Sequence, residues 1–298
     1  MTFFKQKSSN IRKTFLLFSV FLAVIIGIGW AFSRIYASPE ILAFAVGLSV
    51  FMSFVSYWWS DKIVLKISKA RPLKKENNPE IYHIVEKLSS DAGLSMPKIY
   101  LINEPAMNAF ATGRNPEHAV VAVTRGLLEK LDRFELEGVL SHELSHIGNR
   151  DILLSTVVVV LVGFVALLSD FFMRSMFWGG FGRRDDREGG QAQGILMLIG
   201  IVLAILSPIA VTLIQLAISR NREFLADASG ALLTRHPEGL AKALEKISSD
   251  KTPLKVANKA TNHLWISAPS KSKIASWFMT HPPIEERIAR LRSMNLRI

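Results

Sequence analysis

The chain has no cysteine, and charged residues make up only 20% of its 298 positions. Without cysteine it can form neither a disulfide framework nor a metal site with thiolate ligands. Glycine and proline are too few, at 18 and 12, for a collagen-like or disordered chain. Hydrophobic residues reach 49% and are gathered in long blocks, which argues against an ordinary soluble enzyme.

Four apolar runs account for this excess, and none of them carries a charge. They are Phe15–Phe32, Ile41–Trp59, Ile152–Ser169 and Gly194–Ser219. A helix crosses the hydrocarbon core with about 20 apolar residues, and these runs are apolar all round rather than along one stripe. The sequence therefore predicts four transmembrane helices. The net charge of +11 then indicates that the partner is the lipid bilayer and not nucleic acid.

The basic residues near the runs predict which way the helices point. Lysine and arginine are frequent in Lys5–Lys13, before the first run, and in Lys62–Lys75, after the second, whereas Arg34 is alone in the loop between them. Because cytoplasmic loops are enriched in these residues, we expect both chain termini in the cytoplasm. The arginines within Arg174–Arg187 lie between runs three and four and count against this orientation.

The runs divide the chain into four parts. Residues 1–60 hold the first transmembrane pair, 61–151 a first polar piece, 152–219 a transmembrane hairpin and 220–298 a second polar piece. In the first polar piece we expect helices after Asn78 and from Arg133 to Asn149. Between them, short β-rich runs predict strands at Pro97–Ile102, Met107–Thr112 and Ala119–Val123. The second polar piece reads as helical.

The helix expected at Arg133–Asn149 contains the pattern H-E-x-x-H, with His142, Glu143 and His146. Residues four apart lie one turn apart on the same face of a helix, so both imidazoles can reach one metal ion. Glu143 follows the first histidine directly and can reach a water molecule at that metal instead. The pattern predicts a zinc site that hydrolyses its substrate.

A catalytic zinc takes three protein ligands and keeps one position open. The sequence lacks the glycine and histidine that a metzincin would have at positions 149 and 152, so the third ligand must come from elsewhere. Glu223 and Asp227 follow the fourth run and lie four apart on an expected helix. One carboxylate would bind the metal, and the other would orient a histidine.

The number of runs supports this assignment. The two histidines end just before the third run, and Glu223 begins just after the fourth. Two crossings return the chain to the same side of the membrane, whereas one crossing would separate the ligands by roughly 30 Å of hydrocarbon. The metal motif and the transmembrane hairpin therefore predict each other.

Together these segments resemble, over essentially the whole chain, the HtpX subfamily of the M48 membrane zinc metalloproteases. The residues that carry the resemblance are Asn108–Gly113, Ser141–Asp151, Arg222–Ala228, Thr280–Pro283 and Arg287–Ile288. The resemblance implies that His142, His146 and Glu223 bind one zinc ion per subunit. It also implies that Glu143 is the catalytic residue.

The expected fold class is a mainly α membrane protein. It has four transmembrane helices and an α+β, zincin-like (gluzincin) catalytic domain that the transmembrane hairpin splits. The resemblance implies a zinc-dependent endopeptidase that cleaves misfolded or damaged membrane proteins at the cytoplasmic face of a bacterial inner or plasma membrane, in quality control and the stress response. The oligomeric state and any quality-control partners stay open.

Two further residues are candidates for handling the substrate. His281 would donate a hydrogen bond to the oxyanion, or else cap the last helix before the prolines. Asn108 begins a strand of small residues on which an extended substrate would form main-chain hydrogen bonds, or else a plain core strand. The other histidines have no partner at ligand spacing, and we expect them on the surface or at helix caps: His83, His118, His236 and His263.

Two other functions use some of the same features. An intramembrane protease also has H-E-x-x-H, but Arg133, Glu135 and Glu137 place too many charges beside the motif for hydrocarbon. A metal transporter or a metal-binding scaffold is the other alternative. The four runs hold no acid or histidine that would line a transport path. Zinc-dependent cleavage that is absent in Glu143→Gln would separate a protease from a scaffold.

Because the chain has no native cysteine, single cysteines test the topology directly. Lys75→Cys and Ser249→Cys are expected to be protected from an impermeant thiol reagent added outside intact cells. A cysteine within Arg183–Gly190 is expected to react, because this segment joins runs three and four on the far side. If it is labelled only from the cytoplasm, the third and fourth runs do not cross the bilayer.

Overall fold

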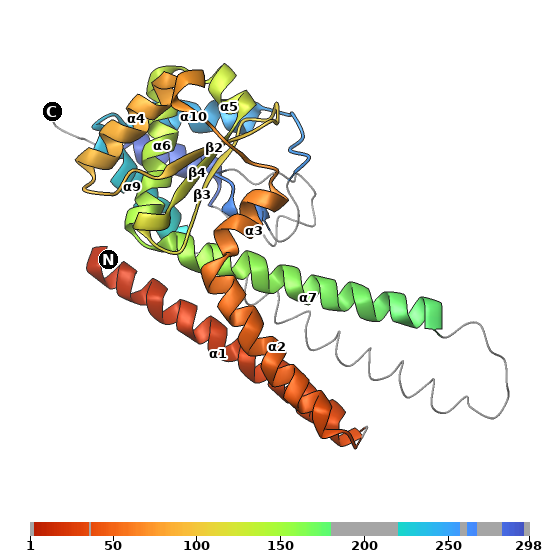
Figure 1. The fold of residues 1–298 in the computed structure, drawn as a ribbon. Helices are drawn as coiled ribbons and strands as arrows, with labels where there is room; N and C mark the ends of the chain where they lie inside the picture. The colour runs from red at the N-terminus through yellow and green to blue at the C-terminus, as the bar shows by residue number, and fades with distance from the viewer. Residues whose placement is uncertain (1–2, 36, 180–219, 257–260, 267–281, 295–298) are drawn as a thin grey trace.

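The computed structural model describes residues 3–35, 37–179, 220–256, 261–266 and 282–294. Two long helices come first, α1 (Phe3–Ile35) and α2 (Pro39–Trp58), and a short helix α3 (Ser60–Ile67) leads into the polar part of the chain. The remaining helices there are α4 (Pro79–Asp91), α5 (Arg125–Lys130), α6 (Arg133–Gly148), α9 (Arg220–Thr234), α10 (Pro237–Ser249) and α11 (Ile284–Arg292). Helix α7 (Asp151–Gly179) projects from this domain beside α1 and α2 (Figure 1).

The polar part of the chain contains, among the described residues, one four-stranded sheet. Its strands β1 (Arg71–Pro72), β2 (Lys98–Ile102), β3 (Ala109–Thr112) and β4 (Val120–Thr124) are arranged in the order β1-β2-β4-β3. Strands β2 and β4 are parallel, whereas β1 and β3 pair antiparallel to their neighbours. Strand β3 is therefore at one edge of the sheet, and the expected strands and helices of the first polar piece are present within a few residues.

Successive side chains along a strand point to opposite faces of the sheet, and here both faces are apolar. One face contributes Ala109, Ala111 and Val121 to the main core, which includes apolar residues of α4, α6 and α10. The other face contributes Phe110 and Ala122 to a second core with α3 and α7. The sheet is thus buried on both sides, and its edge strand β3 lies against the helix that carries the H-E-x-x-H pattern.

Helix α6 is the centre of the domain, and α9 and α10 from the second polar piece pack against it (Figure 1). Its first turn is closed by a capping box, in which Asp132 accepts from the Glu135 N–H and Glu135 accepts from the Asp132 N–H. Gly138 lets α10 approach closely, because a Cβ there would lie 2.5 Å from the Leu240 nitrogen. The described helices of the two polar pieces therefore pack together.

Helices α1 and α2 are long and apolar enough to cross a membrane, over Ser8–Arg34 and Pro39–Trp58. The third predicted run lies on α7, which follows α6 after a bend of 84°, and α6 and α7 qualify as a span only when taken together as a broken pair. The fourth run, Gly194–Ser219, lies outside the described residues. The described part of the chain thus holds two candidate spans, or three if the bent pair α6–α7 counts as one span. The total of four stays a prediction.

The close approach at Gly138 gives a testable consequence. Gly138→Ala places a methyl group against the α10 backbone and is expected to destabilise the fold by about 1–3 kcal/mol. Gly148→Ala, on the same helix, is the control, because its Cβ would meet its nearest neighbour, Leu94, at an ordinary 3.8 Å. Thermal unfolding of the purified protein in detergent measures both. Equal midpoints for the two variants would show that α6 and α10 do not touch at Gly138.

Candidate metal centre

The bend between α6 and α7 brings two of the site residues together. His146 lies on the last turn of α6, and Asp151 is the first residue of α7. Between them Arg150 takes a left-handed conformation with φ of 60°, which costs a non-glycine residue about 1–2 kcal/mol. This turn directs the Asp151 carboxylate back to His146, with 3.0 Å between Oδ2 and the ring Nδ1.

Helix α9 supplies the two carboxylates on the other side of the histidines. Gly230 allows the approach of α9 to α6, because a Cβ there would lie 2.9 Å from Ser141 Oγ and 3.0 Å from the His142 nitrogen. One and two turns earlier on α9 lie Asp227 and Glu223, and both side chains are buried. The expected spacing of four residues therefore puts both carboxylates over the histidine pair.

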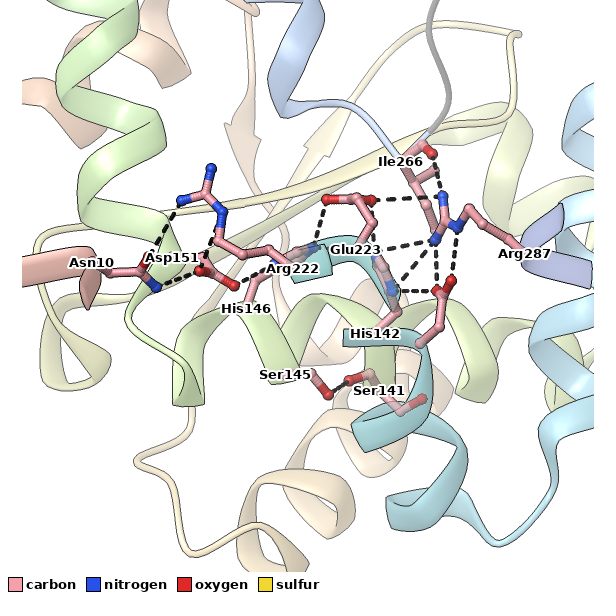
Figure 2. Close-up of polar contacts among 11 residues, drawn as sticks. Asn10, Ser141, His142, Ser145, His146, Asp151, Arg222, Glu223, Ile266 and Arg287 are labelled. Carbon is pink, nitrogen blue, oxygen red and sulfur yellow. Dashed lines mark hydrogen bonds and ion pairs between the residues drawn. The ribbon is translucent and has the colours of Figure 1, made fainter. Parts of the chain in front are cut away.

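The atoms of His142, His146 and Glu223 converge on one point (Figure 2). The two Nε2 atoms are 3.1 Å apart, and the Glu223 oxygens lie 3.8 Å from His142 Nε2 and 3.5 Å from His146 Nε2. Ligand atoms bound at about 2.0–2.1 Å to a tetrahedral ion would be about 3.3 Å apart. Two imidazole nitrogens and one carboxylate are also a typical zinc donor set, so these residues fit a metal ion.

Each histidine is held from behind by a carboxylate. His142 Nδ1 lies 2.9 Å from Asp227 Oδ1, and His146 Nδ1 lies 3.0 Å from Asp151 Oδ2. Such a hydrogen bond fixes the tautomer in which Nδ1 carries the proton and Nε2 is free to bind a metal. The two rings are nearly perpendicular, at 89°, so each presents its Nε2 from a different direction.

A buried arginine completes the support of His142. Arg287 is fully buried, and its guanidinium donates two hydrogen bonds to Asp227, of 2.8 and 2.7 Å, and one to the Ile266 carbonyl at 3.1 Å. This fork geometry is the strong form of the arginine–carboxylate pair. Helix α11 is thereby tied to the site from a position 145 residues after His142.

The charges around the site favour a cation between the histidines. Burial lowers the pKa of His146, but its hydrogen bond to Asp151 and the charge of Glu223 raise that pKa to about 9. Burial also raises the pKa of Asp227, yet Arg287 and the bond to His142 hold it at about 2. The same anionic surroundings that favour a proton on His146 favour a metal ion.

Glu143 faces the same small cavity as the metal-binding group. Burial and the charge of Glu223 raise the pKa of Glu143 to about 7, while His146, Arg287 and a backbone hydrogen bond from Ala111 oppose this rise. The cavity has a volume of about 40 Å³. It is lined by Ala111, His142, Glu143, His146, Asp151, Ile152, Ser155, Glu223, His263, Leu264 and Ile266. A single water molecule needs about 10–15 Å³ of such space, so the cavity has room for a few water molecules and is too small for a peptide.

The structure describes one of the two candidates for substrate handling. Asn108 is buried just before β3, and its backbone N–H and carbonyl bond to the Thr124 hydroxyl. The outer edge of β3 is partly occupied, because the Ile266 N–H donates to the Ala109 carbonyl at 3.0 Å. His281 lies outside the described residues. The substrate roles of Asn108 and His281 both stay predictions.

One expectation about the histidines is wrong. His83, His118 and His236 are exposed, as expected, but His263 is only 7% exposed and lines the cavity. Its Nε2 lies 3.0 Å from the Ser155 carbonyl on α7. The position of His263 depends on the packing of a short 3₁₀ turn, Asn262–Leu264, against a helix about 100 residues earlier, and no local spacing signals this.

The sequence of the chain matches known proteins along its whole length. Residues 75–295 match peptidase family M48. The chain belongs to this family. A protein named "Protease HtpX homolog" from Caldanaerobacter subterraneus subsp. tengcongensis is 44% identical over 297 residues, which cover 99% of both chains. The protein of the same name from Syntrophobacter fumaroxidans is 48% identical over 290 residues, or 96% of this chain and 99% of that protein.

A solved structure shares the fold. The crystal structure of S. mikatae Ste24p superimposes with a TM-score of 0.50 at 22% sequence identity, over 93% of this chain and 65% of that one. At this identity the likeness concerns the fold alone. The family match and the relatives confirm the resemblance read from the sequence, and they establish an HtpX-type membrane metalloprotease of family M48.

The pair between Arg287 and Asp227 gives a second testable consequence. Arg287→Met leaves the Asp227 carboxylate buried without its charge partner, so we expect a loss of about 3–5 kcal/mol of stability and weaker metal binding. Arg292→Met is the matched control on the same helix, since Arg292 is exposed and pairs with Glu238 and Glu245 at the surface. The unfolding midpoint and the metal content are measured for both variants. Equal behaviour would show that Arg287 does not support the site.

Proposed function

We propose that the protein is a zinc-dependent endopeptidase in which His142, His146 and Glu223 hold the metal and Glu143 is the general base and acid. The observation that carries the proposal is the convergence of these three ligand atoms within 4.8 Å of one another, in a cavity that Glu143 also lines. The membership of family M48 supports hydrolysis of peptide bonds as the reaction.

The residues of the site have separate tasks. Zinc, when bound, would polarise the scissile carbonyl and make water acidic enough to attack it near neutral pH. Glu143 accepts the proton of the attacking water and delivers it to the leaving amine. A carboxylate whose pKa is raised by burial is suited to both transfers, and the positive charge of a bound metal would lower that pKa again. Asp227 and Asp151 keep the two imidazoles in the orientation that binds metal.

The substrate is proposed to lie along the edge of β3. Antiparallel pairing with Asn108–Thr112 would place an extended peptide beside Glu143, because Ala111 lines the cavity that holds this carboxylate. Ile266 would have to leave the Ala109 carbonyl for such pairing, and its departure would also enlarge a cavity that is too small for a peptide. His281 is proposed to donate to the oxyanion.

The membrane helices point to the class of substrate. Helices α1 and α2 are candidate spans, and the metal ligands lie at the ends of α6 and α9 that adjoin the predicted hairpin. We therefore propose that misfolded or damaged membrane proteins are cleaved where they emerge at the cytoplasmic face of a bacterial cell membrane. Unfolded substrates suit an enzyme that reads an extended main chain rather than a folded surface.

Replacing the ligands one at a time tests the proposal. His142→Ala, His146→Ala and Glu223→Ala are each expected to lose bound zinc and peptidase activity together, because two ligands do not hold a catalytic ion against competing chelators. Zinc content by atomic absorption and cleavage of an unfolded membrane protein are measured on the same samples. Full zinc occupancy in Glu223→Ala would move the third ligand to Asp227.

Glu143→Gln separates binding from catalysis. The amide keeps the shape of the side chain but does not take up the proton, so we expect zinc to remain while turnover falls by at least about 10²-fold. The control is Glu137→Gln, which is expected to keep full activity. Glu137 precedes Glu143 on α6 and pairs with Lys87 near the surface. Retained turnover in zinc-loaded Glu143→Gln would remove the proposed general base.

A further inference from the structure

The amino-terminal helix contributes a side chain to the surroundings of the proposed metal site. Asn10 lies in the third turn of α1, at the start of the candidate span Ser8–Arg34, and it is only 1% exposed. Its amide nitrogen donates to the Asp151 Oδ1 at 2.6 Å and to the Asn149 carbonyl at 3.1 Å. Figure 2 shows it at one end of a continuous series of polar contacts that reaches Arg287.

The Asp151 carboxylate is shared between Asn10 and His146. Oδ2 lies against the His146 ring nitrogen, and Oδ1 accepts from Asn10. A carboxylate with one oxygen fixed still has freedom to rotate about its side-chain torsions, whereas one held at both oxygens has a single orientation. The orientation of His146 therefore depends on a hydrogen bond that comes from a different part of the chain.

Asn10 also contacts the segment that leads into the third ligand. Its carbonyl oxygen lies 3.5 Å from the Arg222 guanidinium, which itself lies 3.9 Å from Asp151 Oδ1. Arg222 is buried and directly precedes Glu223 on α9. One asparagine side chain thus meets the end of α6, the start of α7 and the start of α9, which are the points where the predicted hairpin leaves and re-enters the catalytic domain.

This arrangement is more specific than an anchor requires. A membrane anchor needs apolar surface, and a buried asparagine at its end costs free energy unless each polar atom is paired. The amide nitrogen of Asn10 donates one hydrogen bond to Asn149 and one to Asp151. Its oxygen accepts from Arg222, so all of its polar groups are paired with other segments of the chain. Thr14, one turn later and also buried, donates to the carbonyl of Asn10 within its own helix.

We propose that Asn10 is a positioning residue of the metal centre, so that the first helix of the chain is a structural part of the active site and not only its membrane anchor. The inference rests on the proposed function, because it takes His146 as a metal ligand. Asn10 holds Asp151, Asp151 holds His146, and a displacement of α1 along its axis changes the presentation of Nε2 to the metal. Metal affinity is thereby linked to the placement of the helix in the bilayer.

The test compares metal binding in single variants of the full chain purified in detergent. Asn10→Leu keeps the branched shape of the side chain but removes its hydrogen bonds. It is expected to weaken binding of Zn²⁺ and Co²⁺ about 10- to 100-fold in competition with a chelator. Its Co²⁺ complex is expected to show a shifted visible spectrum, because His146 is no longer held in one orientation. Thr14→Val, on the same buried face of α1, is the control and is expected to match the wild type.

A second set of variants, in which the two contacting side chains are exchanged, keeps the test valid if Asn10→Leu misfolds. Asn10→Asp removes the donors, and Asp151→Asn supplies one from the other side. Each single change is expected to weaken metal binding, and the double variant to recover most of the loss, since the contact between the two side chains is re-formed with donor and acceptor exchanged. If Asn10 does not act through Asp151, the two losses would add and the double variant would show no recovery.

The outcomes separate this inference from the proposed function. If His146→Ala loses zinc while Asn10→Leu binds it as tightly as the wild type and with the same Co²⁺ spectrum, α1 is only an anchor and the inference is wrong. If His146→Ala itself keeps full metal affinity, the ligand assignment fails first. Weakened binding in Asn10→Leu with recovery in the swapped pair supports the inference.

Discussion

Two imidazoles on one buried helix must present a nitrogen each to the same point, and the rest of the domain is arranged to meet this constraint. Neither ring is fixed by α6 alone. His142 depends on Asp227 from α9, and His146 depends on Asp151 from α7. These carboxylates are themselves buried and are held in turn by Arg287 from α11 and Asn10 from α1. The site is therefore supported from both ends of the chain, and its stability and that of the fold are coupled.

The tight packing of the helices follows from the same constraint. Carboxylates reach the rings only if α9 lies almost in backbone contact with α6, and Gly230 permits this approach beside Ser141 and His142. On the α7 side, the left-handed turn at Arg150 costs free energy and is retained because it directs Asp151 to His146. Helix α7 thus begins where the proposed metal-binding residues of α6 end, which couples this helix to the proposed chemistry.

Local patterns in the sequence predict the elements that carry the proposed ligands. Helical spacing alone puts His142 and His146 on one face of α6, and Glu223 and Asp227 on one face of α9. The strands followed from β-rich runs between turn residues. The supporting residues did not follow from any local pattern. Asn10 lies 141 residues from Asp151, and His263, which the sequence alone places at the surface or at a helix cap, is buried in the domain. Such residues are identified only by the packing of distant segments.

An anomalous difference map at the zinc absorption edge, from crystals of the full chain, tests the central claim most directly. We predict one peak per chain, at about 2.0–2.2 Å from His142 Nε2, His146 Nε2 and a Glu223 oxygen. Asp227 and Asp151 should remain on the far sides of the two rings, each in contact with Nδ1. A peak bound by Asp227 or Asp151 in place of Glu223, or zinc at a different place in the chain, would contradict the account.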